Sequence, residues 1–166
     1  GVIFTQAYSP ISVTGPAFIS LMTGQHVSRH QVSMNVFRGG PSLPETELTL
    51  AELFVEKEYQ TAAFLSGFTL HPNLGLSQGF SVYDGPRRSS RRWGDETANK
   101  ALKWLQKTPE RRFLWYHTYD AHGPWTRFGT DCGKRADDPE TLLLLVVKLK
   151  TQIVDSMDLP IRQPFS

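Results

Sequence analysis

Short apolar runs and helically spaced apolar positions alternate along this chain of 166 residues. Residues 61–65 and 113–118 are apolar or aromatic runs of strand length, and residues 2–7 form a third β-rich run. Residues 68–85 are rich in Gly, Pro, Asn and Ser, which predicts irregular structure. We therefore expect three strands with helices between and after them.

Helix signals mark four further segments. Pro16 suits the first turn of a helix that runs to about residue 22, and Gly24 lies where that helix would end. Thr49 and Glu52 form a capping-box pattern in front of a second helix. The third and fourth helices are expected over residues 95–107 and 139–154. The apolar positions expected to face the core from the second and third helices are Leu50, Leu53, Phe54, Ala98, Ala101, Leu102 and Leu105.

Strands that alternate with helices predict an α/β fold with a mainly parallel sheet flanked by helices. In such sheets, functional groups gather on loops that follow the carboxyl ends of the strands. Thr14 and His122 both lie on loops of this kind. Thr14 also precedes the helix that Pro16 opens, and a helix N-terminus presents N–H groups and partial positive charge to an anion.

Composition narrows the classes of function. A hydrophobic content of 39% with 20% charged residues indicates a globular protein, and a net charge of +2 is too small to indicate a nucleic-acid or membrane partner. The single cysteine, Cys132, excludes an internal disulfide and a thiolate-rich zinc site. No apolar run approaches the roughly 20 residues that span a bilayer. The chain opens on Gly1 without a secretory signal, and we expect a mature or truncated start.

The stretch from Thr14 to Gly24, Thr-Gly-Pro-Ala-Phe-Ile-Ser-Leu-Met-Thr-Gly, resembles the signature of the sulfatase-like family within the alkaline-phosphatase superfamily. In that signature a Cys, Ser or Thr nucleophile is followed by x-Pro and later by Leu-x-Thr-Gly. The flank Phe-Thr-Gln-Ala-Tyr-Ser, residues 4–9, is similar to the family's lead-in. Further fragments follow in the expected order at residues 50–53, 59–64, 75–80, 83–84, 113–117 and 120–122.

The resemblance implies a metal-assisted hydrolase or transferase of sulfate- or phosphate-type esters, with Thr14 as nucleophile and metal ligand. A free Thr hydroxyl is a poor nucleophile until a base or a metal activates it. The implied cofactor is a divalent ion (Zn, Mn, Ca or Mg), and the implied partner is a small anionic ester. His122 occupies the position of a family histidine that contacts the substrate or assists the leaving group. His30 and Asp120 are expected to orient or shape the site.

Three departures from the family pattern refine this expectation. Thr14 cannot be oxidised to the formylglycine aldehyde of strict sulfatases, and Phe18 replaces the usual Arg. Residues 65–68 read Leu-Ser-Gly-Phe instead of Gly-Lys-Trp-His, so the sulfate-binding Lys and His are missing. These features favour the Thr-nucleophile branch, which includes phosphodiesterases, phosphonate hydrolases and phosphoglycerol transferases.

The other metal motifs of the family, an Asp pair on an opening strand and a later Asp-His-Gly, are absent. We therefore expect an incomplete chain that is inactive alone. Residues 1–126 would form part of an alkaline-phosphatase/sulfatase-like sandwich, and residues 127–166 a divergent helical tail. Family members are often periplasmic or secreted, but the sequence assigns no location.

Two other functions remain open at this point. One is a non-catalytic remnant, or a module that only binds an anion at the Thr14 helix. The other is nucleic-acid binding through the basic run from Arg87 to Arg92, which lies beside Trp93. No second basic stripe accompanies that run, so a solvated surface segment is the favoured interpretation of it.

Overall fold

The computed structural model describes residues 5–35, 40–86, 91–108, 111–120 and 122 of the chain. Of the strand expected at residues 2–7, only residues 5–7 fall within these ranges, and they are not in a strand. The helix expected at residues 139–154 and the proposed tail at 127–166 lie outside the described residues.

The centre of the fold is a parallel sheet in the order β2-β1-β3. Strand β1, Gln60–Leu65, pairs with β2, Val82–Asp84, on one side and with β3, Arg112–His117, on the other. Both pairings are parallel, which confirms the α/β expectation. Strand β2 was not expected, because it covers only three residues and follows two 3-10 turns, Phe68–Leu70 and Pro72–Leu74.

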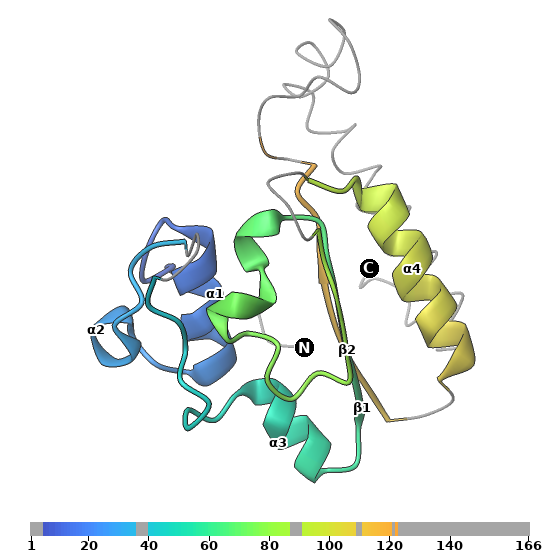
Figure 1. The fold of residues 1–166 in the computed structure, drawn as a ribbon, viewed down its shortest axis with the longest axis horizontal. Coiled ribbons are helices and arrows are strands. Elements are labelled where there is room, and N and C mark those ends of the chain that lie inside the picture. The colour runs from blue at the N-terminus through green and yellow to red at the C-terminus, as the bar shows by residue number, and fades with distance from the viewer. Residues whose placement is uncertain (1–4, 36–39, 87–90, 109–110, 121, 123–166) are drawn as a thin grey trace, which may run out of the picture.

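Helices cover both faces of this sheet (Figure 1). Helices α1, Thr14–Thr23, α2, Val27–His30, and α3, Leu50–Glu56, lie on one side, and α4, Gly94–Lys107, lies on the other. Strand β1 is buried on both faces because helices cover both sides of the sheet. Its side chains alternate between the two faces. Ala63 and Leu65 join the core beneath α1, whereas Ala62 and Phe64 join the cluster beneath α4.

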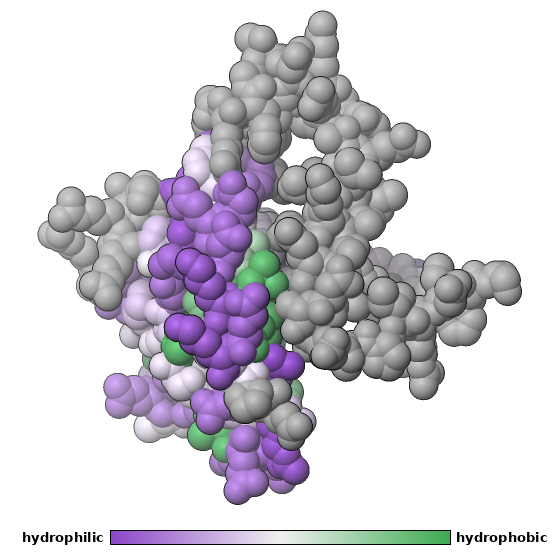
Figure 2. Space-filling model, turned by 90° about the vertical axis from the view of Figure 1, so that its right-hand side faces the viewer, coloured by the Kyte–Doolittle hydropathy of each residue, from purple (hydrophilic) through white to green (hydrophobic). Residues whose placement is uncertain are grey.

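The expected boundaries of α1 and α4 are confirmed to within about two residues. Gly24 ends α1 with a φ of 68°, in the left-handed region that glycine adopts without strain. In α4, Ala98, Ala101 and Leu105 are buried as the apolar stripe predicts. The outward surface of α4 is hydrophilic (Figure 2). This arrangement is the one expected for an amphipathic helix that covers a sheet face.

The apolar face expected for α3 is wrong in part. The capping box between Thr49 and Glu52 is present, but the fully buried residue of the helix is Ala51. Leu50 and Leu53 are 37% and 43% exposed. Helix α3 packs through Ala51, beside the close backbone approach of Gly79, and through Phe54, whose ring stacks on Phe113 of β3 with 4.2 Å between centroids. Pattern alone could not select this side, because apolar residues occupy both sides of so short a helix.

Candidate functional site

Thr14 is the first residue of α1, whereas the sequence predicted that it would lie on the loop in front of the helix. Val13 precedes it as the N-cap and supplies no side-chain hydrogen bond to the first turn. The Thr14 side chain is partly exposed. A hydroxyl at this place lies at the positive end of the helix dipole, which stabilises negative charge nearby.

Fewer N–H groups of this turn are available to an anion than the sequence suggested. The Gly15 N–H donates to Asn35 Oδ1 at 2.7 Å, and Pro16 has no N–H to offer. No described residue accepts a hydrogen bond from the Thr14 N–H, which is therefore the donor that this turn can offer an anion. Gly15 itself has no room for a side chain, because a Cβ would lie 2.8 Å from Leu74 Cδ2. Asn35 and Leu74 thus fix the start of α1.

Phe18 and His117 connect α1 to the end of β3. Their ring centroids lie 5.2 Å apart, edge to face. Phe18 follows Thr14 by one helical turn, so the contact sets the place of that turn relative to the sheet. Burial lowers the pKa of His117, and its Nδ1 has no hydrogen-bond partner among the described residues. Sequence reasoning missed His117, although a histidine that ends an aromatic strand was a usable signal.

His122 lies in the loop after β3, as expected. Its side chain is exposed, and its ring stacks on Tyr119 with 4.4 Å between centroids. Tyr119 in turn contacts the His117 ring at 6.3 Å. The link that the structure shows between the Thr14 helix and His122 therefore runs through the rings of Phe18, His117 and Tyr119.

Asp120 shapes this loop, as the sequence suggested. Its Oδ1 accepts the Gly94 N–H at 3.1 Å and so caps the start of α4, whose own N-cap residue, Trp93, makes no side-chain capping bond. Oδ2 of the same carboxylate is buried and has no hydrogen-bond partner among the described residues. The Asp120 carboxylate is therefore engaged in fixing the start of α4.

His30 has the orienting and packing role that the sequence favoured. It is 6% exposed, and the Val32 N–H donates to its Nδ1 at 3.2 Å. The proton of the neutral ring therefore lies on Nε2, which donates to Ser20 Oγ at 2.9 Å. Burial is the main cause that lowers the pKa of His30. This bond ties α2 to the middle of α1.

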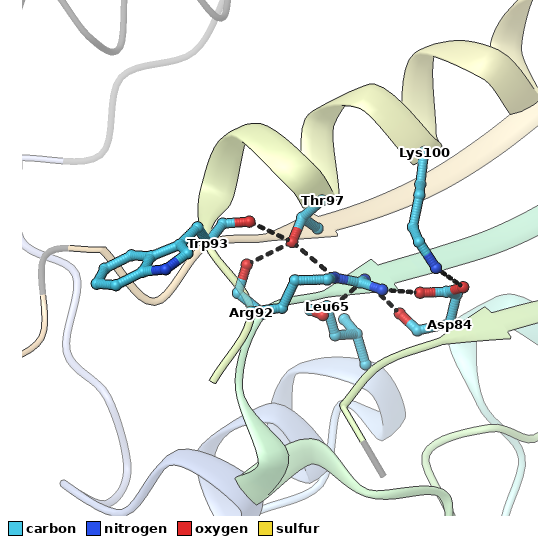
Figure 3. Close-up of polar contacts among 7 residues, drawn as sticks. Leu65, Asp84, Arg92, Trp93, Thr97 and Lys100 are labelled. Carbon is cyan, nitrogen blue, oxygen red and sulfur yellow. Dashed lines mark hydrogen bonds and ion pairs between the residues drawn. The ribbon is translucent and has the colours of Figure 1, made fainter. Parts of the chain in front are cut away.

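The expectation for the basic run is wrong for Arg92. Its side chain is 12% exposed and pairs with Asp84 at the end of β2, to which Lys100 also donates at 2.8 Å (Figure 3). The same guanidinium donates to the Leu65 carbonyl at 2.8 Å and to Thr97 Oγ1 at 3.0 Å. Arg92 therefore joins both strand ends to α4 and is neither a solvated residue nor one free to contact phosphates.

The second described arginine of that run also has protein contacts. Arg91 lies 4.5 Å from the Trp93 ring centroid and donates to the His122 carbonyl at 3.2 Å. Residues 87–90 lie outside the described ranges. The structure thus gives the nucleic-acid interpretation no support from either described arginine.

The described residues do not fit a divalent metal by themselves. Within the ranges that the structure describes, no group of three or more His, Cys, Asp or Glu side chains is arranged to hold an ion. Thr14 alone would be one oxygen ligand, whereas hard divalent ions take about six. Within the same ranges, no helix is both long enough and apolar enough to cross a membrane.

Comparison with known proteins identifies the family. The structure is similar to that of a 2-O GAG sulfatase, with a TM-score of 0.59, 23% sequence identity and 74% of this chain covered. The match covers 28% of that chain, so the present sequence spans under a third of its length. No curated protein matches the sequence. The sulfatase family model matches residues 1–141, and the chain therefore belongs to the sulfatase family.

Proposed function

We propose that this chain carries the nucleophile-bearing part of a phosphate-ester hydrolase or transferase of the sulfatase family. Thr14 is the proposed nucleophile. The observation that carries the proposal is the place of the Thr14 hydroxyl in the first turn of α1, where the N-cap residue Val13 makes no side-chain capping bond. An anionic ester is favoured there by the helix dipole and by the Thr14 N–H.

The proposed reaction has two steps. Thr14 Oγ loses its proton and attacks the phosphorus, and the bond from phosphorus to the leaving oxygen breaks as a phospho-threonine forms. His122 gives a proton to the leaving oxygen. Water, or the hydroxyl of an acceptor alcohol, then attacks the phosphorus, the bond from phosphorus to Thr14 Oγ breaks, and the proton that the attacking hydroxyl loses goes to Oγ. His122 regains a proton from the solvent, which takes up the one that Thr14 released in the first step. We assign the activation of Thr14 to parts of the protein outside the described residues, because none of these supplies a base or a ligand set beside it.

Phosphate-type esters are preferred over sulfate esters for a chemical reason. Oxidation of a Thr side chain gives a ketone, so Thr14 cannot supply the aldehyde on which strict sulfatases depend. Phe18 also places an apolar ring, packed against Trp115 and His117, where an arginine would offer a charge. The site is thus less suited to a sulfate group held by paired cations.

Substitution of Thr14 in the complete coding sequence that contains this chain tests the proposal. Thr14→Ala should lower the hydrolysis of an aryl phosphodiester by about 1,000-fold or more, as expected for loss of a nucleophile. Thr23→Ala is the matched control at the other end of α1, where the hydroxyl donates to the Ile19 carbonyl and accepts the Gln25 N–H. Full activity in Thr14→Ala would refute the assignment.

The lack of a ligand group in the described part favours one alternative, a non-catalytic piece that folds and binds an anion. We propose that the 166-residue chain alone is inactive for this reason. Turnover of an aryl phosphodiester by the isolated chain with added zinc or manganese would contradict that proposal. An inactive complete protein that still binds inorganic phosphate in a Thr14-dependent way would favour the alternative over the enzyme.

A further inference from the structure

The segment from Arg91 to Gly94 contacts β3 and the loop after it at three places. Arg91 Nη1 donates to the His122 carbonyl at 3.2 Å, and the Gly94 N–H donates to Asp120 Oδ1 at 3.1 Å. Near the end of β3, the Tyr116 hydroxyl donates to the Gly94 carbonyl at 3.0 Å. The peptide groups on the two sides of the Gly94 Cα therefore bond to the loop and to the strand that leads into it.

The same segment is fixed on its other side to the end of β1. The Arg92 N–H donates to the Ser66 carbonyl at 2.9 Å, and Arg91 and Gly67 form an isolated antiparallel bridge. The Arg92 side chain adds its bonds to Leu65 and Thr97 (Figure 3). The segment from Arg91 to Gly94 therefore connects the His122 loop to the end of the central strand β1, because it is hydrogen-bonded to both.

The missing side chain of Gly94 lets the Asp120 carboxylate approach its backbone. A Cβ on Gly94 would lie 2.4 Å from Asp120 Oδ2, well inside the closest approach of real side chains. The neighbouring Asp120 Oδ2 is buried. An alanine at Gly94 would therefore displace the Asp120 carboxylate without removing any hydrogen-bonding group from the chain. We expect this displacement to disturb the turn that carries His122, whose N–H donates to the Tyr119 carbonyl at 3.1 Å.

We propose that Arg91, Gly94 and Asp120 are positioning residues for His122. This inference rests on the proposed function, in which His122 gives a proton to the leaving oxygen. Proton transfer requires the two heavy atoms to come within about 3 Å of each other, so small displacements of the ring are costly. The exposed His122 ring stacks on Tyr119, and Arg91 donates to the His122 carbonyl.

The functional test compares esters that differ in their need for an acid. A dinitrophenolate leaves readily without a proton, whereas a phenolate needs one. In the complete protein, Gly94→Ala and Arg91→Ala should each slow hydrolysis of a phenyl phosphodiester by about 10-fold and that of a dinitrophenyl phosphodiester by less than about 2-fold. Gly85→Ala is the matched control, since its Cβ would meet Leu65 at an ordinary 3.5 Å. Equal losses on both esters would overturn the inference.

A spectroscopic readout separates this inference from the proposed function. The ring signals of His122 in the NMR spectrum of the 166-residue chain can be assigned by their loss in His122→Gln. They should shift in Gly94→Ala and Arg91→Ala but not in Gly85→Ala. Unchanged His122 signals in folded variants, as judged by their melting temperatures, would overturn the inference. If Thr14→Ala leaves turnover intact, the proposed function fails, and the ring signals still decide whether these residues place His122.

Discussion

Phe18 and His117 meet with their ring planes at 86° and their centroids 5.2 Å apart. This edge-to-face contact joins the first turns of α1 to the last residue of β3, two elements that are about a hundred residues apart in the chain. His117 is half-buried, and its Nδ1 atom is buried without a described hydrogen-bond partner. The ring contact therefore fixes α1 relative to the end of β3, and the burial of His117 lowers the pKa of its ring.

We expect the free energy of unfolding to fall as the pH drops below about 6.5. Burial lowers the pKa of His117 from its ordinary value of 6.5, so the unfolded chain binds more protons than the folded chain below that pH. Stability rises with pH in that window and is flat above it. His117→Phe keeps a ring against Phe18 and removes the titration, so urea denaturation at several pH values should show a shallower slope for this variant. An identical slope would contradict the prediction.

Loss of the Ser20 hydroxyl should destabilise the fold. Ser20→Ala leaves the Nε2 proton of His30 buried without its acceptor, and an orphaned buried donor costs about 1–3 kcal/mol. Urea denaturation of Ser20→Ala measures this cost. Ser33→Ala, an exposed serine nearby in the chain, should change the free energy of unfolding by less than about 0.5 kcal/mol. Equal effects of the two variants would rule out the expected role of the bond.

Arg92 should not tolerate replacement by lysine. A lysine cannot reach Asp84, the Leu65 carbonyl and Thr97 at once, because it lacks the planar fork of five donors. We expect Arg92→Lys to lower the free energy of unfolding by about 2 kcal/mol. Arg111→Lys is the control, since the Arg111 side chain is 64% exposed and lies 3.8 Å from Glu58. The contrary result would be a similar, small effect in both variants.

The 166-residue chain should bind divalent ions weakly. Within the described ranges no ligand group is assembled, and Thr14 supplies at most one oxygen. Ligands that bind the folded state raise its melting temperature by mass action. We therefore expect no increase in melting temperature with micromolar zinc, manganese, calcium or magnesium. A zinc-dependent increase that disappeared in Thr14→Ala would show that the chain does assemble a site.

Nucleic-acid binding should be negligible at physiological salt. A protein that neutralises several phosphates shows an affinity that falls steeply with salt. Arg92 is engaged with Asp84, and Arg91 with Trp93 and the His122 carbonyl. Fluorescence anisotropy with a labelled DNA duplex should therefore show no saturable binding near 0.15 M salt, the physiological ionic strength. Saturable, salt-dependent binding would restore the alternative interpretation.

Local sequence patterns predicted the elements whose signals lie within a few residues. Pro16 and Gly24 bracketed α1, and the capping box at Thr49 marked the start of α3. The two longer strands were visible as apolar runs. Strand β2 was missed, because three residues carry too little pattern and are held in place by pairing with β1. The buried side of α3 was predicted only in part, since Phe54 packs on β3 whereas Leu50 and Leu53 are exposed, and burial depends on which neighbour packs against the helix.

For the site, the sequence by itself determined the residue types and their order: a Thr before a Pro-led helix and a histidine after an aromatic strand. These signals are local, because caps, turns and strand runs involve neighbours in the chain. Only the tertiary structure decided that Asn35 accepts the Gly15 N–H, and that Arg92 pairs with Asp84 instead of lying free on the surface. It also decided that the Asp120 carboxylate lies against Gly94. Each of these contacts joins residues distant in sequence, and only the packing of α4 and the loops around the sheet brings them within bonding distance.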